Sequence, residues 1–217
     1  ALVNTILNRM AEARRLPPVP FFLADVPPHP PLTLPDADWK AAALTLPGRL
    51  YAMLLAGRHA AGSYYTPDVI AGQVAARVLE PDMPAASSPP AVCDPAMGGG
   101  AFLLAAAESL AARLSTSLPP NEARWQALQK LYGLDSDPAA VILARAALWM
   151  WLGDPDRDSR ATLEHHLYTA DALLDDLPAG FPSAFDVLLG NPPFASVFAR
   201  ASAGRPGYTD ALRRRYA

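Results

Sequence analysis

The 217 residues are enough for one domain with a sizeable core, and the net charge of −3 neither marks the chain as a nucleic-acid binder nor excludes one. About half of the residues are hydrophobic (51%), yet no apolar run approaches the roughly 18 residues of a membrane span, and no signal peptide is recognisable. Cys93 is the only cysteine, which excludes a disulfide framework and a cysteine-based metal cluster. We therefore expect a soluble cytoplasmic protein.

Residues 1–60 are expected to form a helical, proline-rich segment without chemistry of its own. Apolar residues at helical spacing predict an amphipathic helix over residues 2–15, and the proline-dense stretch 16–35 predicts an extended connector. Asp36 is expected to cap a second helix that breaks near Pro47 and then resumes. A helical cap packed on a sheet accounts for all of this.

Residues 61–217 follow as the second segment, which we expect to form the ligand-binding part of a single domain, and their first element is a predicted helix. Thr66-Pro67-Asp68 combines an N-cap hydroxyl, a proline at the first helical position and an acid in the first turn. The apolar residues that follow predict one apolar face on this helix: Val69, Ile70, Val74, Val78 and Leu79.

A strand, a glycine turn and a helix come next, the arrangement that cradles a nucleotide-like ligand. The strand is Ala91–Asp94, the turn runs through three glycines to Gly100, and the helix reaches about Leu114. A nicotinamide site is disfavoured, because Leu103 stands where the third glycine of GxGxxG would be. Since the Asp94 carboxylate would repel a pyrophosphate, the turn favours a cationic or zwitterionic ligand.

Two further strands end in acids. Leu131–Asp135 is followed by a helix that Asp137 is expected to cap, which leaves Asp135 free to bind ribose hydroxyls. The strand Leu167–Thr169 leads to Asp171, which is placed either to accept a hydrogen bond from an adenine amine or to cap a turn. The adjacent His165 and His166 are expected to point to opposite faces of a strand, in a structural role.

The fourth strand, Phe185–Leu189, delivers Asn191 to its carboxyl end, where open α/β sheets bind ligands. Pro192 and Pro193 end the strand and stiffen the backbone, and Phe194 adds a stacking surface. An amide oxygen and a proline carbonyl form a rigid pair of acceptors for a planar amine. Strands that alternate with helices predict parallel pairing through right-handed crossovers, and a last helix is expected near 208–216.

Five motifs in this order resemble the S-adenosylmethionine-dependent DNA adenine methyltransferases of restriction–modification systems. They are YYTP at 64–67, DPAMGGGAF at 94–102, GLDSDP at 133–138, TADAL at 169–173 and NPPF at 191–194. The order looks like the gamma type, and GSYYTP resembles type II and type IIG enzymes. The resemblance implies a Rossmann-like class I methyltransferase sheet in the order 3-2-1-4, incomplete here because the family's sheet has more strands.

The resemblance also implies the site residues. Tyr65 and Thr66 would meet the methionine part of S-adenosylmethionine. The turn residues would line the same end: Asp94, Pro95, Ala96, Gly98 and Gly100. Asp135 would hold the ribose, with Ser136 beside the adenine ring and Asp171 and Ala172 at the adenine amine. The catalytic residues would be Asn191, Pro192, Pro193 and Phe194, which hold the substrate adenine; Asn191 would also contact the cofactor, and no metal is implied.

The adenine would have to be flipped out of the DNA duplex to reach such a pocket. No target-recognition domain is recognisable, so we expect DNA binding to depend on a domain outside this chain, in a missing C-terminal half or a partner subunit. As a fragment the chain is expected to be inactive. The alternatives are a methyltransferase of protein glutamine or RNA, and a non-catalytic subunit that keeps the fold.

Overall fold

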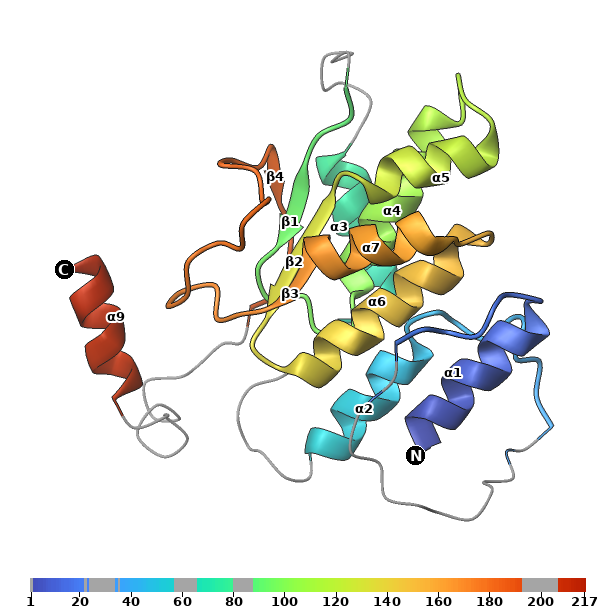
Figure 1. The fold of residues 1–217 in the computed structure, drawn as a ribbon, viewed down its shortest axis with the longest axis horizontal. Coiled ribbons are helices and arrows are strands. Elements are labelled where there is room, and N and C mark those ends of the chain that lie inside the picture. The colour runs from blue at the N-terminus through green and yellow to red at the C-terminus, as the bar shows by residue number, and fades with distance from the viewer. Residues whose placement is uncertain are drawn as a thin grey trace.

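The computed structural model describes residues 2–21, 23, 34, 36–56, 66–79, 88–192 and 207–217. Its centre is a four-stranded parallel sheet with the order β3-β2-β1-β4 (Figure 1). The strands are β1 (Val92–Asp94), β2 (Leu131–Asp135), β3 (Leu167–Thr169) and β4 (Val187–Leu188). The α/β class, the parallel pairing and the strand order predicted from the sequence are confirmed.

The register of the sheet brings the carboxyl ends of the strands to one edge. Asp94 at the end of β1 pairs with Gly133 of β2, and Asp135 at the end of β2 pairs with Thr169 of β3. On the other side of β1, Cys93 pairs with Leu188 of β4. Because all four strands run in the same direction, the residues that follow them collect along this edge.

The helices between the strands lie on one face of the sheet (Figure 1). α4 (Ala101–Leu114) connects β1 to β2, while α6 (Pro138–Leu152) and α7 (Arg157–His166) connect β2 to β3. Two successive right-handed crossovers in the same direction place their helices on the same side. α3 (Asp68–Val78) and α5 (Pro120–Leu128) pack against α4.

The two faces of the sheet are covered differently. Toward the helices, the strands contribute apolar residues to one core cluster: Val92, Leu131, Leu167 and Val187. On the opposite face, Phe181 and Phe185 of the segment before β4 contact Tyr132 of β2, with ring centroids 5.2 and 5.4 Å away. Tyr132 also stacks on His166 at 4.2 Å. In the part of the chain that the structure describes, this aromatic cluster packs on that face of the sheet.

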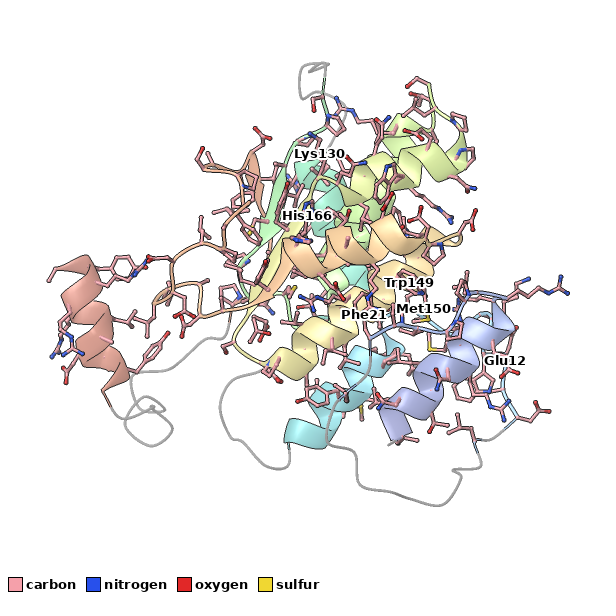
Figure 2. All side chains as sticks on the ribbon, in the orientation of Figure 1. Glu12, Phe21, Lys130, Trp149, Met150 and His166 are labelled. Atoms are coloured by element: carbon pink, nitrogen blue, oxygen red, sulfur yellow. The ribbon has the colours of Figure 1, made fainter. Side chains whose placement is uncertain are left out.

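The N-terminal helices join the same core. α1 (Leu2–Ala13) buries Leu7 and Met10 completely, and α2 (Leu46–Ala56) contacts both α1 and α6. Phe21 meets Trp149 of α6 edge to face, with ring centroids 6.1 Å apart. Figure 2 shows Phe21, Trp149 and Met150 together at this junction. The described residues 16–19 carry neither helix nor strand, as expected for the connector.

The second helix does not begin after Asp36, contrary to the sequence-based prediction. Residues 36–45 form turns, in which the Asp38 carboxylate accepts from the backbone N–H groups of Lys40 and Ala41 at 3.1 and 3.0 Å. The helix begins only at Leu46. Pro47 does not break it, because a proline in the first turn lacks only an N–H that would have no partner within the helix.

The apolar face predicted for α3 was also wrong, except for Leu79 at the end of the helix, which is buried. The helix buries Ala71 and Ala75, while Val69 and Ile70 are 70% and 50% exposed, and Val74 and Val78 are exposed as well. The small alanines face α4 because they allow the two helices to approach closely. A count of large apolar residues therefore indicated the wrong side.

Two helices were missed. α5 has few large apolar residues at helical spacing, and α7 begins in the stretch that was interpreted as a polar loop. α7 does carry a recognisable start, because Asp156 and Ser159 form a reciprocal capping box. His165 and His166 end this helix and do not lie on a strand. None of the helices in the described part of the chain combines the length and the apolar character needed to cross a membrane.

Candidate active site

Four polar residues stand in a row along the carboxyl edge of the sheet. Asp171, Asp135, Asp94 and Asn191 follow β3, β2, β1 and β4, which is the order of the strands across the sheet. The strand order reverses between β1 and β4, and such reversal points are where open α/β sheets bind ligands. A cavity of about 70 Å³ lies there, and its lining includes five of the predicted residues: Thr66, Asp94, Ala96, Gly98 and Asn191.

The glycine turn is fixed between β1 and α4 by backbone hydrogen bonds. The N–H of Met97 donates to the carbonyl of Leu134 on β2 at 3.0 Å, and the N–H of Gly100 donates to the carbonyl of Met97 at 2.8 Å. Gly100 is the N-cap of α4 with a φ of 85°, a left-handed conformation that favours glycine. The turn therefore starts the helix while its backbone stays close to the cavity.

Asp135 is not free, contrary to the sequence-based expectation. Its Oδ2 accepts from the backbone N–H of Gly98 at 2.8 Å, and its Oδ1 accepts from that of Asp137 at 2.8 Å. Asp137 caps α6 through the N–H of Ala139, as predicted. Each carboxylate oxygen has a second lone pair, so Asp135 can still accept from ligand hydroxyls. Burial raises the pKa of Asp135 even though both backbone hydrogen bonds act in the opposite direction.

Asp94 is almost completely buried, with 1% of its surface exposed. Its Oδ1 accepts from the N–H of Ala96 at 3.0 Å, and burial raises its pKa to about 7. Gly190 packs directly on this carboxylate, because a Cβ at position 190 would stand 2.5 Å from Oδ1. The backbone just before Asn191 therefore lies directly against the Asp94 carboxylate. Because no side chain fits between them, the residue before the asparagine is a glycine.

The Asn191 side chain is oriented by Thr66. Its amide nitrogen donates to the Thr66 hydroxyl oxygen at 3.2 Å, across 125 residues of sequence. The prediction that Thr66 caps α3 was therefore wrong: Pro67 is the N-cap residue, and the cap has no side-chain hydrogen bond. Because the amide nitrogen faces Thr66, the amide oxygen of Asn191 is the atom directed away from it.

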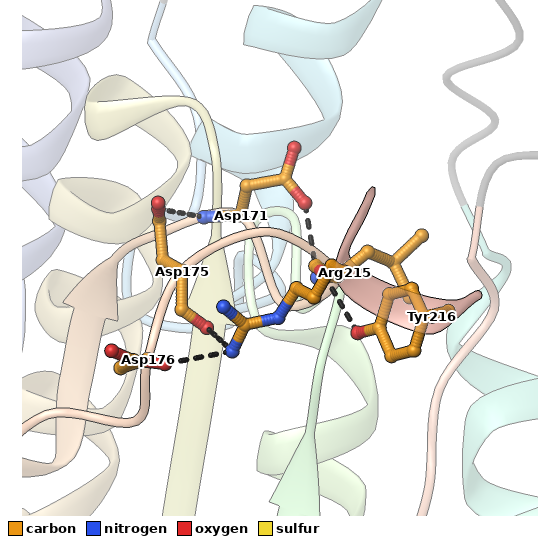
Figure 3. A network of polar contacts seen from close by, with 6 residues as sticks. Asp171, Asp175, Asp176, Arg215 and Tyr216 are labelled. Atoms are coloured by element: carbon orange, nitrogen blue, oxygen red, sulfur yellow. Dashed lines mark hydrogen bonds and ion pairs between the residues drawn. The ribbon is translucent and has the colours of Figure 1, made fainter. Parts of the chain in front are cut away.

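Asp171 sits in a turn and contacts the last helix of the chain. Its Oδ1 accepts from the N–H of Leu173 at 3.0 Å and from the Tyr208 hydroxyl at 3.4 Å. Tyr208 opens α9 (Tyr208–Tyr216), the helix predicted at the end of the chain. Figure 3 shows that Arg215 and Tyr216 of α9 reach the same turn that holds Asp171. Asp171 therefore has the turn-capping role that the sequence allowed.

The remaining predicted residues are distributed around this edge. Pro95 and Ala172 are half-buried, Gly100 is buried, and Ser136 and Pro192 are exposed. Tyr65, Pro193 and Phe194 lie outside the described residues. The three acids and Asn191 were thus brought to one edge as expected, although Asp135 and Asp171 do not line the cavity that holds Asp94 and Asn191.

Sequence reasoning missed the contribution of α2. Thr45, Gly48 and Ala52 line the cavity together with the predicted residues. Tyr51 of the same helix lies near the Asp137 carboxylate, and burial together with Asp137 and Asp135 raises the pKa of its phenol to about 12. No local pattern marks these residues, because none of them belongs to a recognisable turn or motif.

A comparison with known families gives the context for this site. The model of the family described as N-6 DNA Methylase matches residues 48–211. The chain belongs to the N-6 DNA methylase family. The match begins at Gly48 on α2, so it includes part of the helix that borders the cavity as well as the glycine turn and Asn191.

Two solved structures that are similar to parts of this chain belong to larger proteins. A modification subunit of a putative type I restriction enzyme from Vibrio vulnificus YJ016 is 23% identical and covers 70% of this chain and 28% of its own, with a TM-score of 0.44. The methyltransferase subunit of a type I restriction-modification system from Streptococcus thermophilus is 23% identical and covers 75% of this chain and 30% of its own, with a TM-score of 0.43. The chain therefore spans less than a third of either structure. No curated protein matches the chain.

Proposed function

We propose that this chain is the donor-binding and catalytic part of a DNA methyltransferase, which transfers a methyl group from S-adenosylmethionine to the exocyclic amino group of adenine. The observation that carries the proposal is the row of acceptors at the strand ends, with Asn191 and Asp94 in one glycine-lined cavity. The family supports a methyl donor and a DNA substrate. A DNA substrate would place the protein in the bacterial cytoplasm.

The side chains fit the proposed donor, because they supply acceptors where that molecule has donors. S-adenosylmethionine carries an ammonium group, a sulfonium, two ribose hydroxyls and an adenine amine. Asp94 would face the cationic end, Asp135 the ribose and Asp171 the adenine amine, with Ser136 and Ala172 beside the ring. When bound, the donor supplies an electrophilic methyl group on sulfur, and the acids keep the cationic part and the adenosine part at opposite ends of the edge.

Asn191 and Pro192 would prepare the acceptor nitrogen. An adenine amine is a poor nucleophile because its lone pair is delocalised into the ring. The Asn191 side-chain oxygen and the Pro192 carbonyl would each accept one of its two hydrogens, which favours a tetrahedral nitrogen with an available lone pair. Acceptors fixed in advance act most strongly where positive charge develops in the transition state. The hydrogen bond from the Asn191 amide nitrogen to Thr66 supports this orientation.

The family's usual target is DNA, and a recognition domain or partner subunit outside residues 1–217 would have to supply sequence-specific contacts. Arg213, Arg214 and Arg215 on α9 form a basic run, but Arg215 is engaged by Asp176 at 2.8 Å. α9 alone therefore offers few charges for phosphate contacts. Pro193 and Phe194 complete the motif and would hold the flipped base, with stacking worth roughly 1–3 kcal/mol.

The test uses the complete gene product that contains this chain and a donor labelled on its methyl group. We expect label in DNA, recovered as 6-methyladenine, and none in RNA or in protein glutamine. Asn191→Ala should lower kcat by at least a hundredfold while the affinity for the donor changes by less than threefold, because the amide acts on the acceptor. Arg160→Ala, on the exposed face of α7, is the matched control. Label only in protein or RNA, or full activity of Asn191→Ala, would overturn the proposal.

A further inference from the structure

The backbone of α2 touches the backbone of the glycine turn. A Cβ added to Gly48 would stand 3.0 Å from the Cα of Gly99, and a Cβ added to Gly99 would stand 2.9 Å from the Cα of Gly48. Both distances are shorter than an ordinary van der Waals contact, so a side chain at either position would push the two backbones apart. A helix that precedes the methyltransferase motifs is therefore in direct contact with the turn that borders the site.

Two residues of α2 border one end of the site, whereas Tyr51 of the same helix lies near Asp137, which follows β2. Gly48 and Ala52, one helical turn apart, line the cavity that contains Asp94 and Asn191. Asp135 and Asp171, at the proposed ribose and adenine end, do not line it. Gly48 and Ala52 therefore stand at the end of the site where the methionine part of the donor would lie.

A second contact fixes α2 relative to the catalytic residues. Thr45, just before α2, is buried, and its hydroxyl donates to the Asp68 carboxylate at the start of α3 with a distance of 2.8 Å. Thr66, two residues before Asp68, accepts a hydrogen bond from the Asn191 amide nitrogen. The position of α2 is thus coupled through short contacts to the side chain proposed to act on the substrate.

We propose that Gly48 and Ala52 of α2 form the wall that limits the space for the aminocarboxypropyl arm of the methyl donor, so that α2 selects donors by the size of this arm. The inference rests on the proposed function. The cavity of about 70 Å³ is far smaller than the roughly 300–1,000 Å³ of pockets that enclose a whole ligand of this size, so it holds one arm and not the entire donor.

Ala52 is the position at which this wall can be changed without disturbing the helix. Its side chain is half-buried at the cavity, whereas the neighbouring Met53 is 71% exposed. Leucine is nearly as good a helix former as alanine, so Ala52→Leu should keep α2 intact while it fills the cavity. Met53→Leu, on the solvent side of the same helix, is the matched control.

The experiment measures dissociation constants by calorimetry with the complete gene product and two ligands. S-adenosylhomocysteine carries the arm, and 5′-methylthioadenosine lacks it. We expect Ala52→Leu to raise the dissociation constant of S-adenosylhomocysteine by at least tenfold. The dissociation constant of 5′-methylthioadenosine should change by less than twofold. Met53→Leu should leave both dissociation constants unchanged, and Asp135→Asn should raise both of them. If Ala52→Leu fails to show a cooperative thermal transition, Ala52→Val serves in its place. We then expect a smaller loss of affinity, for S-adenosylhomocysteine only.

The outcomes separate this inference from the function on which it rests. If the wild-type protein binds neither ligand, the proposed function fails. If it binds both, and Ala52→Leu weakens them equally or weakens neither, only the role of α2 fails. Selective loss of the ligand that carries the arm supports the wall, because a general effect on folding would not distinguish two ligands that share the same adenosine part.

Discussion

At the scale of single residues, burial has the largest effect on the chemistry of Asp94. A carboxyl group that is 1% exposed loses most of its hydration, so its charged form is disfavoured. One backbone hydrogen bond, from Ala96, offsets part of this cost. The resulting pKa of about 7 means that a cation bound nearby would favour the ionised form near neutral pH. The neighbouring Cys93 is buried as well, and burial raises the pKa of its thiol to about 12.

The pKa of Asp94 leads to a prediction for the stability of the unliganded protein. The folded-state pKa of about 7 lies above the ordinary value of 3.8, so the folded state holds a proton that the unfolded state has released. The stabilisation is present at low pH and is lost as the pH rises through 7. We expect Asp94 to lower the free energy of unfolding by about 2–3 kcal/mol between pH 5 and pH 8.

Urea unfolding of the wild type and of Asp94→Asn at both pH values measures this effect. The variant cannot ionise at position 94, so the difference in stability between variant and wild type should increase toward pH 8. Other titrating groups are common to the two proteins and cancel in the comparison. A difference that stays constant with pH would show that Asp94 titrates well below 7.

At the scale of elements, α6 is tied to β3 by a half-buried arginine. Arg145 donates from Nη2 to the carbonyls of Glu164 and Leu167, at 3.2 and 2.5 Å. Its guanidinium also lies 6.0 Å from the ring centroid of Phe21. Burial lowers the pKa of Arg145, with Glu164 acting in the opposite direction. One side chain therefore joins a sheet helix, the end of α7 and the N-terminal connector.

Arg145→Met should destabilise the protein by about 2–3 kcal/mol, because methionine fills much of the space but leaves two carbonyls without their charged donor. The matched control is Arg160→Met, whose partner Glu164 is on the same helix and where both side chains are exposed by 40% or more. An exposed pair of this kind contributes about 0.5 kcal/mol or less. Chemical denaturation compares the two, and equal small losses would contradict a structural role for Arg145.

At the scale of the whole molecule, α9 is attached differently from the other helices. It buries none of its own residues, and its contacts with the turn at 171–176 are polar (Figure 3). Arg215 donates to the Asp175 carbonyl at 3.2 Å and to the Asp176 carboxylate at 2.8 Å, and the Tyr216 hydroxyl donates to the Leu173 carbonyl at 2.6 Å. The helix is thus held at the surface by hydrogen bonds and not by a core.

Amide hydrogen exchange should therefore be much faster in α9 than in α6, which is buried along most of its length. Arg215→Ala should increase exchange in α9 further and leave α6 unchanged, because the hydrogen bonds from Arg215 to Asp175 and Asp176 attach α9 to the surface turn. Mass spectrometry of peptic fragments measures both helices in one experiment. Equal protection of α9 and α6 would mean that α9 unfolds only together with the core.

The sequence by itself determined the sheet and the residues along its edge. Each strand end carries its own signal within a few residues: Asp94 before the glycine turn, Asp135 before the capped helix, and Asn191 before the prolines. The alternation of strands and helices predicts parallel pairing through right-handed crossovers, and the resemblance to the methyltransferase family supplied the order β3-β2-β1-β4. Local patterns suffice here because turn chemistry and strand propensity depend on neighbours in the chain.

Only the tertiary structure decided which of these residues share a cavity and what surrounds them. The bond between Thr66 and Asn191, the contact of Gly48 with Gly99 and the hydrogen bond from Gly98 to Asp135 join segments far apart in the sequence. The buried face of α3 likewise depends on its fit to α4, where alanines allow close approach and the larger Val69 and Ile70 face outward. Packing and hydrogen bonding between distant segments leave no local pattern, because they are properties of surfaces that exist only once the chain has folded.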